Sequence, residues 1–151
     1  MNPLKSPPSN DVRALGRPAL RILVIDDDEC VSTAIQAILA RRCYRTELAS
    51  RAYAGIQALN ASNFDAVLVD IFMPGMNGID TIAYLRRASA VPIIAMSGLS
   101  SRASSNSTDY LGMAIQSGAS ASIRKPFSPE QLVDAIDRSI GTAAIAEVSM
   151  R

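Results

Sequence analysis

Five residues with polar or charged side chains come directly after short apolar runs of the chain. They are Asp26 and Asp27 after 20–25, Asp70 after 64–69, Ser97 after 91–96, and Lys125 after 119–124. Carboxylates, a hydroxyl and an ammonium group are the side chains that hold a hard divalent cation and bind phosphoryl oxygens. The chemistry open to this set is therefore metal-assisted phosphoryl transfer.

Three of these residues, Asp26, Asp27 and Asp70, are acids, which would repel one another in a partly dehydrated site unless a cation lay between them or their pKa values rose. Mg²⁺ prefers oxygen ligands and is typically held by one or two carboxylates together with phosphate oxygens. Asp70 would then be a nucleophile, because carboxylates form aspartyl phosphates. Lys125 would pair with one phosphoryl oxygen and the Ser97 hydroxyl would donate to another.

The elements that must position these residues alternate along the chain. Strands are expected at 20–25, 44–48, 64–69, 91–96 and 119–124. Helices are expected after the first strand as far as Arg41 and Arg42, at 51–60, after the 72–77 loop, at 109–117, and from the N-cap Ser128 to Gly141. Apolar strands alternating with helices predict an α/β fold with a doubly wound parallel sheet and helices on both faces. Such sheets place functional groups at the carboxyl ends of their strands, so the five polar residues should form one site.

Composition removes several classes of function. The 151 residues contain 15 Lys and Arg against 14 Asp and Glu, so no basic field points to nucleic acid, and we expect no direct nucleic-acid contact. There is no His, which excludes a Ser-His-Asp triad and histidine metal ligands. A chain of this length predicts one domain.

The remaining features bear on location and on the ends of the chain. Cys30 and Cys43 bracket one predicted helix, roughly 20 Å apart, too far for a disulfide. With no signal peptide and no apolar run of spanning length, we expect a cytoplasmic protein without membrane insertion. Residues 1–19 are interpreted as a flexible N-terminal arm, 20–141 as the folded domain, and 142–151 as a C-terminal tail.

At the level of motifs, residues 20–141 resemble a receiver domain of two-component response regulators, of the chemotaxis-regulator-like single-domain type. The motifs that carry the resemblance are Asp26-Asp27, Asp70 with Met73-Pro74 and Gly78, Ser97, and Lys125-Pro126-Phe127. The resemblance implies five strands in the flavodoxin-like order 2-1-3-4-5. It also implies that Asp70 accepts a phosphoryl group from the phosphohistidine of a sensor histidine kinase or from a phosphotransfer protein.

The same resemblance implies roles for the other residues. Asp27 and Asp70 would contact Mg²⁺, Asp26 would assist directly or through water, and the backbone carbonyl of Phe72 would add a ligand. Ser97 would take the place of the family's Ser or Thr, and Lys125 that of its phosphate-pairing lysine. The Lys125–Pro126 bond would be cis.

Two departures from the family's pattern predict that the signal is read differently here. The aromatic residue usual three positions before the lysine is Ser122, which has no ring to report that the site is filled. The segment 97–118 is longer than is usual, and its surplus is the Ser-rich stretch 98–110.

The function expected is that of a stand-alone receiver, because 151 residues leave no room for a DNA-binding effector domain. It would signal by contact with a downstream protein or by phosphorelay, and would not be a metabolic enzyme. The first alternative is an interaction module of the same fold that does not use phosphate. A second is a Mg²⁺-dependent phosphohydrolase, although Phe72 stands where such enzymes carry a second acid. A flavodoxin-like nucleotide binder fits less well, because the acids after 20–25 would repel phosphate without a metal.

Overall fold

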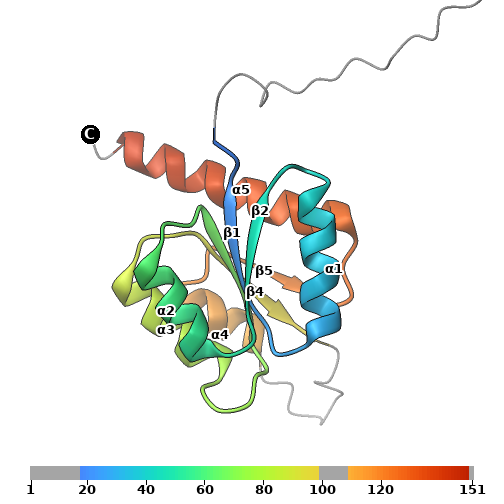
Figure 1. Ribbon diagram of the computed structural model, residues 1–151. Coiled ribbons are helices and arrows are strands. Elements are labelled where there is room, and N and C mark those ends of the chain that lie inside the picture. The colour runs from blue at the N-terminus through green and yellow to red at the C-terminus, as the bar shows by residue number, and fades with distance from the viewer. Residues whose placement is uncertain (1–17, 99–108, 150–151) are drawn as a thin grey trace, which may run out of the picture.

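In the part of the chain that the structure describes, five parallel strands form one sheet in the order β2-β1-β3-β4-β5 (Figure 1). The computed structural model describes residues 18–98 and 109–149, so the predictions for 1–17 and 99–108 lie outside the described residues. The strands are β1 (Arg21–Ile25), β2 (Arg45–Ala49), β3 (Ala66–Asp70), β4 (Ile93–Ser97) and β5 (Ala121–Arg124). The predicted fold class and the strand order implied by the resemblance are both confirmed.

Helices cover both faces of the sheet, as Figure 1 shows. They are α1 (Glu29–Ala40), α2 (Ala52–Ala61), α3 (Gly78–Ala88), α4 (Tyr110–Gln116) and α5 (Pro129–Ser149). Each face of the sheet carries its own apolar cluster. One cluster lies under α1 and α5 and includes Ile35, Leu39 and Ile136, and the other lies under α2, α3 and α4 and includes Ile56 and Leu85.

Burial of the strands explains why their sequences read as continuous apolar runs. Every residue of β3 and β4 is buried, including Asp70 and Ser97 at their carboxyl ends. Strands in the interior of a parallel sheet are covered on both faces, so neither face can be polar. β4 begins at Ile93, two residues later than expected, because Pro92 has no N–H to donate to a neighbouring strand.

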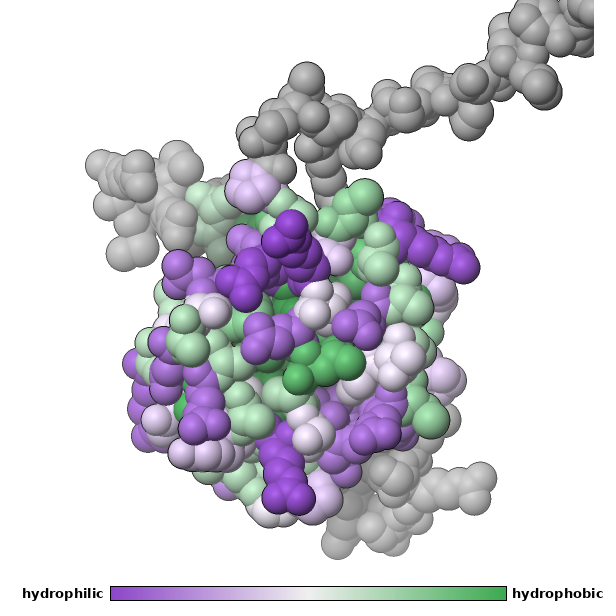
Figure 2. All heavy atoms as spheres, viewed as in Figure 1, coloured by the Kyte–Doolittle hydropathy of each residue, from purple (hydrophilic) through white to green (hydrophobic). Residues whose placement is uncertain are grey.

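The two edge strands, β2 and β5, are less buried than the interior strands, and β2 carries charged side chains. Arg45 and Glu47 are exposed on it, and the Glu47 carboxylate forms an ion pair of 3.6 Å with Arg21 of β1. Charged side chains on an edge strand discourage pairing with another chain. Hydrophilic and hydrophobic residues are interspersed over the face in Figure 2. Among the helices within 18–98 and 109–149, none is both long and apolar enough to cross a membrane.

The start of α5 follows the predicted capping pattern. The Ser128 hydroxyl accepts a hydrogen bond from the Gln131 N–H (3.1 Å), and the Gln131 side-chain oxygen accepts one from the Ser128 N–H (2.9 Å). This reciprocal pair is a capping box, which satisfies two N–H groups at the beginning of the helix. α5 therefore starts directly after the loop that carries Lys125.

The predicted end of this helix at Gly141 is wrong, and so is the predicted tail 142–151 over residues 142–149; residues 150–151 lie outside the described residues. α5 continues to Ser149. Gly141 does not have a positive φ, unlike Gly118 (φ +116°) after α4, so its backbone does not terminate the helix. Gly costs about 1 kcal/mol relative to Ala inside a helix. The alanines at 143, 144 and 146 are the best helix formers and favour continuation.

A Gly141→Ala substitution tests this correction. A Cβ at Gly141 meets no atom within 4 Å, so we expect the free energy of unfolding to rise by about 1 kcal/mol in chemical denaturation. The control is Gly118→Ala, where a Cβ would lie 2.6 Å from Arg86 Cγ and the positive φ disfavours alanine, so stability should fall. A loss of stability in Gly141→Ala would mean that the helix ends there.

Candidate phosphoryl-transfer site

The register of the sheet brings the predicted site residues to one edge. Ile25 lies opposite Val69 in the parallel pair β1–β3, so Asp26 and Asp70 follow on adjacent strands. Ser97 ends β4 and pairs with Arg124, the residue before Lys125. β1 pairs with both β2 and β3, which makes this the point where the strand order reverses and the place where such sheets bind ligands. The predicted convergence of the strand ends is confirmed.

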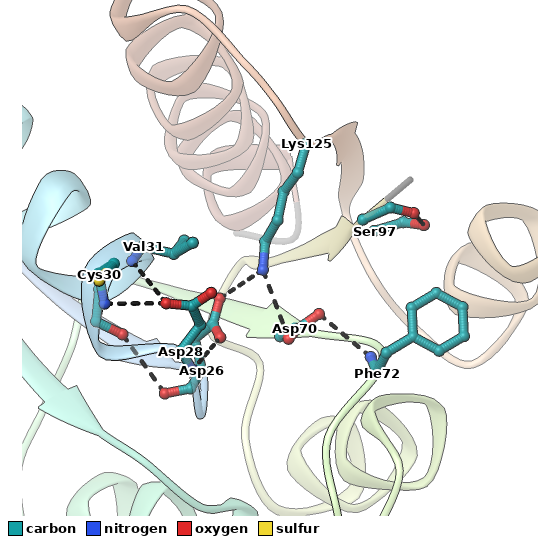
Figure 3. A network of polar contacts seen from close by, with 10 residues as sticks. Asp26, Asp28, Cys30, Val31, Asp70, Phe72, Ser97 and Lys125 are labelled. Carbon is teal, nitrogen blue, oxygen red and sulfur yellow. Dashed lines mark hydrogen bonds and ion pairs between the residues drawn. The ribbon is translucent and has the colours of Figure 1, made fainter. Parts of the chain in front are cut away.

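Lys125 joins the two buried acids. Its Nζ lies 2.7 Å from Asp26 Oδ2 and 3.5 Å from Asp70 Oδ2 (Figure 3). The side chains of Asp26 and Asp70 are almost wholly buried, whereas that of Lys125 remains 17% exposed. A flexible ammonium group that reaches both carboxylates offsets part of their repulsion, and it stays accessible to a ligand from solvent.

Asp27 completes an acidic cluster at the rim of the site. One oxygen from each of Asp26, Asp27 and Asp70 lies within 4.8 Å of the others, and Asp27 is exposed. Three carboxylates against one ammonium leave an excess of negative charge that a divalent cation would offset. A donor set made only of oxygens suits a hard cation such as Mg²⁺ and not a thiol-preferring or imidazole-preferring metal. The residues therefore fit the predicted metal.

The surroundings of Asp70 raise the pKa of its carboxyl group. Burial, followed by the negative charge of Asp26, raises the pKa of Asp70 from 3.8 to about 6. The Lys125 ammonium and the Phe72 N–H act in the opposite direction. Both effects follow from the rule that a low dielectric or a like charge disfavours the ionised form, whereas a cation or a donor favours it. At neutral pH the carboxylate is ionised and able to act as a nucleophile.

The loop after β3 orients Asp70. Its Oδ1 accepts a hydrogen bond of 3.2 Å from the Phe72 N–H, which leaves Oδ2 facing Lys125. Gly78, at the start of α3, donates its N–H to the Ile71 carbonyl (2.8 Å). A Cβ there would lie 2.2 Å from the Asp70 carbonyl oxygen, so only glycine lets α3 approach this closely. The role predicted for the Phe72 carbonyl stays a prediction.

Ser97 is close to the site but does not contact Asp70. Its hydroxyl donates to the Gly98 carbonyl oxygen (3.4 Å), and Figure 3 shows the side chain directed away from Asp70. The Ser97 carbonyl accepts from the Lys125 N–H (2.7 Å), so the β4 and β5 ends are tied together. The Lys125–Pro126 bond is cis, as the resemblance implied.

The first acids after β1 divide into two roles. Asp28 is the N-cap of α1, and its carboxylate accepts from the N–H groups of Cys30 and Val31. Asp26 Oδ1 accepts from the Asp28 N–H (2.9 Å), which holds that carboxylate in place beneath Lys125. Cys30 and Cys43 are free, as predicted.

One contact beside the site was not predicted. The Phe72 ring packs edge-to-face on the Tyr110 ring, with centroids 4.9 Å apart and an interplanar angle of 77°. Tyr110 is the first residue of α4. Because the two residues are 38 positions apart (110 minus 72) and no spacing pattern links them, only the fold reveals this pair.

Asp70→Asn removes the charge of this side chain and keeps its shape. Because the pKa of Asp70 is raised, we predict that this substitution increases the free energy of unfolding by an amount that depends on pH. Below the ordinary pKa of 3.8, the carboxyl is protonated in both folded and unfolded chains. As pH rises from there to about 6, the unfolded chain releases its proton first, so the parent protein loses stability relative to Asp70→Asn. In metal-free buffer we expect the stability advantage of Asp70→Asn to grow across this window and then level off.

Chemical denaturation at a series of pH values with a chelator measures this difference. The control is Asp134→Asn, whose side chain is 56% exposed and pairs with Arg138 on the surface of α5. It should show no comparable rise over the same pH range. An Asp70→Asn difference that did not change with pH would contradict the electrostatic description of the site.

Comparisons with known proteins agree with this geometry. A family model described as the response regulator receiver domain matches residues 22–137. MtrA of Mycobacterium tuberculosis, a DNA-binding response regulator, is 34% identical over 113 residues, which are 75% of this chain and 47% of that protein. YrkP of Bacillus subtilis, an uncharacterized transcriptional regulatory protein, is 36% identical over 114 residues, 76% of this chain and 46% of its own. The chain spans about half the length of these curated relatives.

Solved structures of similar proteins share this fold. NtrX from Brucella abortus in complex with ADP superimposes with a TM-score of 0.78 at 26% identity, covering 89% of this chain and 30% of NtrX. A CheY-like response regulator receiver domain protein from Methanospirillum hungatei has a TM-score of 0.76 at 25% identity, covering 85% of this chain and 99% of its own. With the family model matching most of its length, the chain belongs to the family of response regulator receiver domains.

Proposed function

We propose that this receiver domain accepts a phosphoryl group on Asp70 in a Mg²⁺-dependent reaction, from a sensor histidine kinase or a phosphotransfer protein. The observation that carries the proposal is the position of Asp70 Oδ2, which faces the Lys125 ammonium within a cluster of three carboxylates. An ionised oxygen beside a mobile cation is what phosphoryl transfer needs on its acceptor side.

The step is an exchange of bonds at phosphorus. A carboxylate oxygen of Asp70 attacks the phosphoryl group of a phosphohistidine and forms a P–O bond. The P–N bond breaks, and its electron pair stays on the imidazole nitrogen. Lys125, with Nζ 3.5 Å from Asp70 Oδ2, lies close enough to pair with a phosphoryl oxygen without a large movement. Hydrolysis by water then returns the carboxylate and releases inorganic phosphate.

The metal would be held by Asp27 and Asp70, with Asp26 assisting and the Phe72 carbonyl as a further ligand. When bound, Mg²⁺ supplies positive charge that offsets the carboxylates and the developing charge on the phosphoryl oxygens. Ser97 would turn its hydroxyl from the Gly98 carbonyl, its present acceptor, to a phosphoryl oxygen. A rotation of the side chain about χ1 would redirect the hydroxyl.

The output we propose is contact with a downstream protein or further transfer of the phosphoryl group in the cytoplasm. The domain would act on no other substrate, so its chemistry is limited to its own phosphorylation and dephosphorylation. MtrA is named as a DNA-binding regulator, and this chain matches under half of it, so DNA binding is a property stated of that protein. Our expectation that this chain makes no direct nucleic-acid contact stays a prediction.

The test is the intact mass of the protein after incubation with acetyl phosphate and Mg²⁺. We expect a gain of one phosphoryl group that is lost in Asp70→Asn and when Mg²⁺ is chelated. Lys125→Ala should accept phosphate more slowly, because it lacks the ammonium 3.5 Å from Asp70 Oδ2. Asp134→Asn is a matched acidic control on α5 and should behave as the parent protein.

Two outcomes would contradict the proposal. A parent protein that gains no mass under these conditions would instead be an interaction module that does not use phosphate. Repeated turnover of small phosphoesters, abolished by Asp70→Asn, would identify a phosphohydrolase.

A further inference from the structure

Phe72 connects the Asp70 carboxylate to a helix that holds none of the site residues, through its backbone N–H on one side and its ring on the other. Its N–H donates to Asp70 Oδ1 (3.2 Å), and its ring meets the Tyr110 ring at 4.9 Å between centroids. Figure 3 shows the ring pointing away from the carboxylates. Two contacts therefore lead from Asp70 to the first residue of α4.

Tyr110 is the first residue of α4, so a displacement of its side chain would act on the first turn of that helix. It is half-buried and packs against the apolar cluster beneath α2, α3 and α4. Asp109 caps α4 directly before it, accepting from the Gly112 N–H (2.9 Å). α4 has seven residues, and Ala114 is its one buried residue. A helix this short, with little buried surface, is easily shifted by a change at its first turn.

Phosphorylation changes the first of these contacts. In the free protein the Phe72 N–H donates to an ionised carboxylate, and such charge-assisted hydrogen bonds are roughly twice as strong as neutral ones. In an acyl phosphate, the remaining carboxyl oxygen is a neutral carbonyl, while the negative charge lies on the phosphoryl oxygens. The Phe72 N–H thus loses its charged acceptor, which weakens one of the contacts that hold the Phe72 backbone beside Asp70.

We propose that the Phe72–Tyr110 pair couples the state of Asp70 to the position of α4. The proposal rests on the proposed function, because it names how that modification is read. It places the reporting ring on α4, whereas the β5 position where the family's pattern has an aromatic residue is Ser122, opposite Ala95. Coupling of this kind is reciprocal, so a change at Tyr110 must also alter how readily the site takes up a phosphoryl analogue.

Hydrogen exchange of the α4 amides in the full chain, with and without Mg²⁺ and beryllofluoride, tests the coupling. In the parent protein we expect exchange rates over Tyr110–Gln116 to change about fivefold or more on addition of the analogue. Tyr110→Phe keeps the ring and should keep this response. Tyr110→Leu and Phe72→Leu keep apolar bulk without the ring pair and should lose most of it.

Two further variants serve as controls in this experiment: a double variant of the ring pair and a substitution of a tyrosine on α3. Phe72→Leu with Tyr110→Leu should lose no more response than either single variant, because both remove the same contact. Tyr84→Leu alters a tyrosine on α3 that is 43% exposed, and it should respond as the parent protein does. The binding constant for beryllofluoride, measured on the same samples, should shift in Tyr110→Leu and not in Tyr84→Leu.

Intact mass after acetyl phosphate treatment separates the two ways of failing. If Tyr110→Leu gains an Asp70-linked phosphoryl group and α4 still responds in full, the coupling is overturned and the proposed function stands. If the parent protein neither gains mass nor responds, both are overturned. The coupling is supported if Tyr110→Leu is phosphorylated without a change in hydrogen exchange over α4, while Tyr110→Phe shows that change.

Discussion

Repulsion among three carboxylates at one end of the sheet is the interaction on which the rest of the site depends. Asp26 and Asp70 are held side by side because β1 and β3 are neighbours in parallel register, and Asp27 joins them at the rim. Burial first, and then the negative charge of Asp26, disfavour the ionised form of Asp70 and raise its pKa. Lys125, 2.7 Å from Asp26, offsets part of it. The three carboxylates still exceed the one ammonium in charge, and the divalent cation that we propose would offset the difference.

The fold supplies that arrangement through backbone contacts around the acids. The Phe72 N–H orients the Asp70 carboxylate, and the Asp28 N–H holds Asp26. The Gly78 N–H anchors α3 to the Ile71 carbonyl at a distance that any Cβ would prevent. The Phe72 and Asp28 N–H groups belong to loops that follow buried strands, and Gly78 begins the helix that follows the β3 loop. The apolar strands therefore act at the site only indirectly, by fixing where each loop begins.

Local patterns predicted most of the fold and of the site, and contacts between distant residues account for what they did not predict. Apolar runs located the strands, and the capping box at Ser128 located the start of α5, because both signals act over a few neighbouring residues. The helix end predicted at Gly141 was wrong, because the helix-breaking tendency of one glycine is outweighed by the alanines after it. The Phe72–Tyr110 contact has no local signal at all, since the packing of α4 beside the β3 loop creates it.

Calorimetric titration with Mg²⁺ at pH 7.5 tests most directly whether the three acids form one cation site. We predict a single site in the parent protein and a loss of affinity of at least about tenfold in both Asp27→Ala and Asp70→Asn. Asp134→Asn, which alters an exposed acid on α5, should bind Mg²⁺ as the parent does. Equal affinity in all four proteins would contradict the shared site, and with it the mechanism proposed for Asp70.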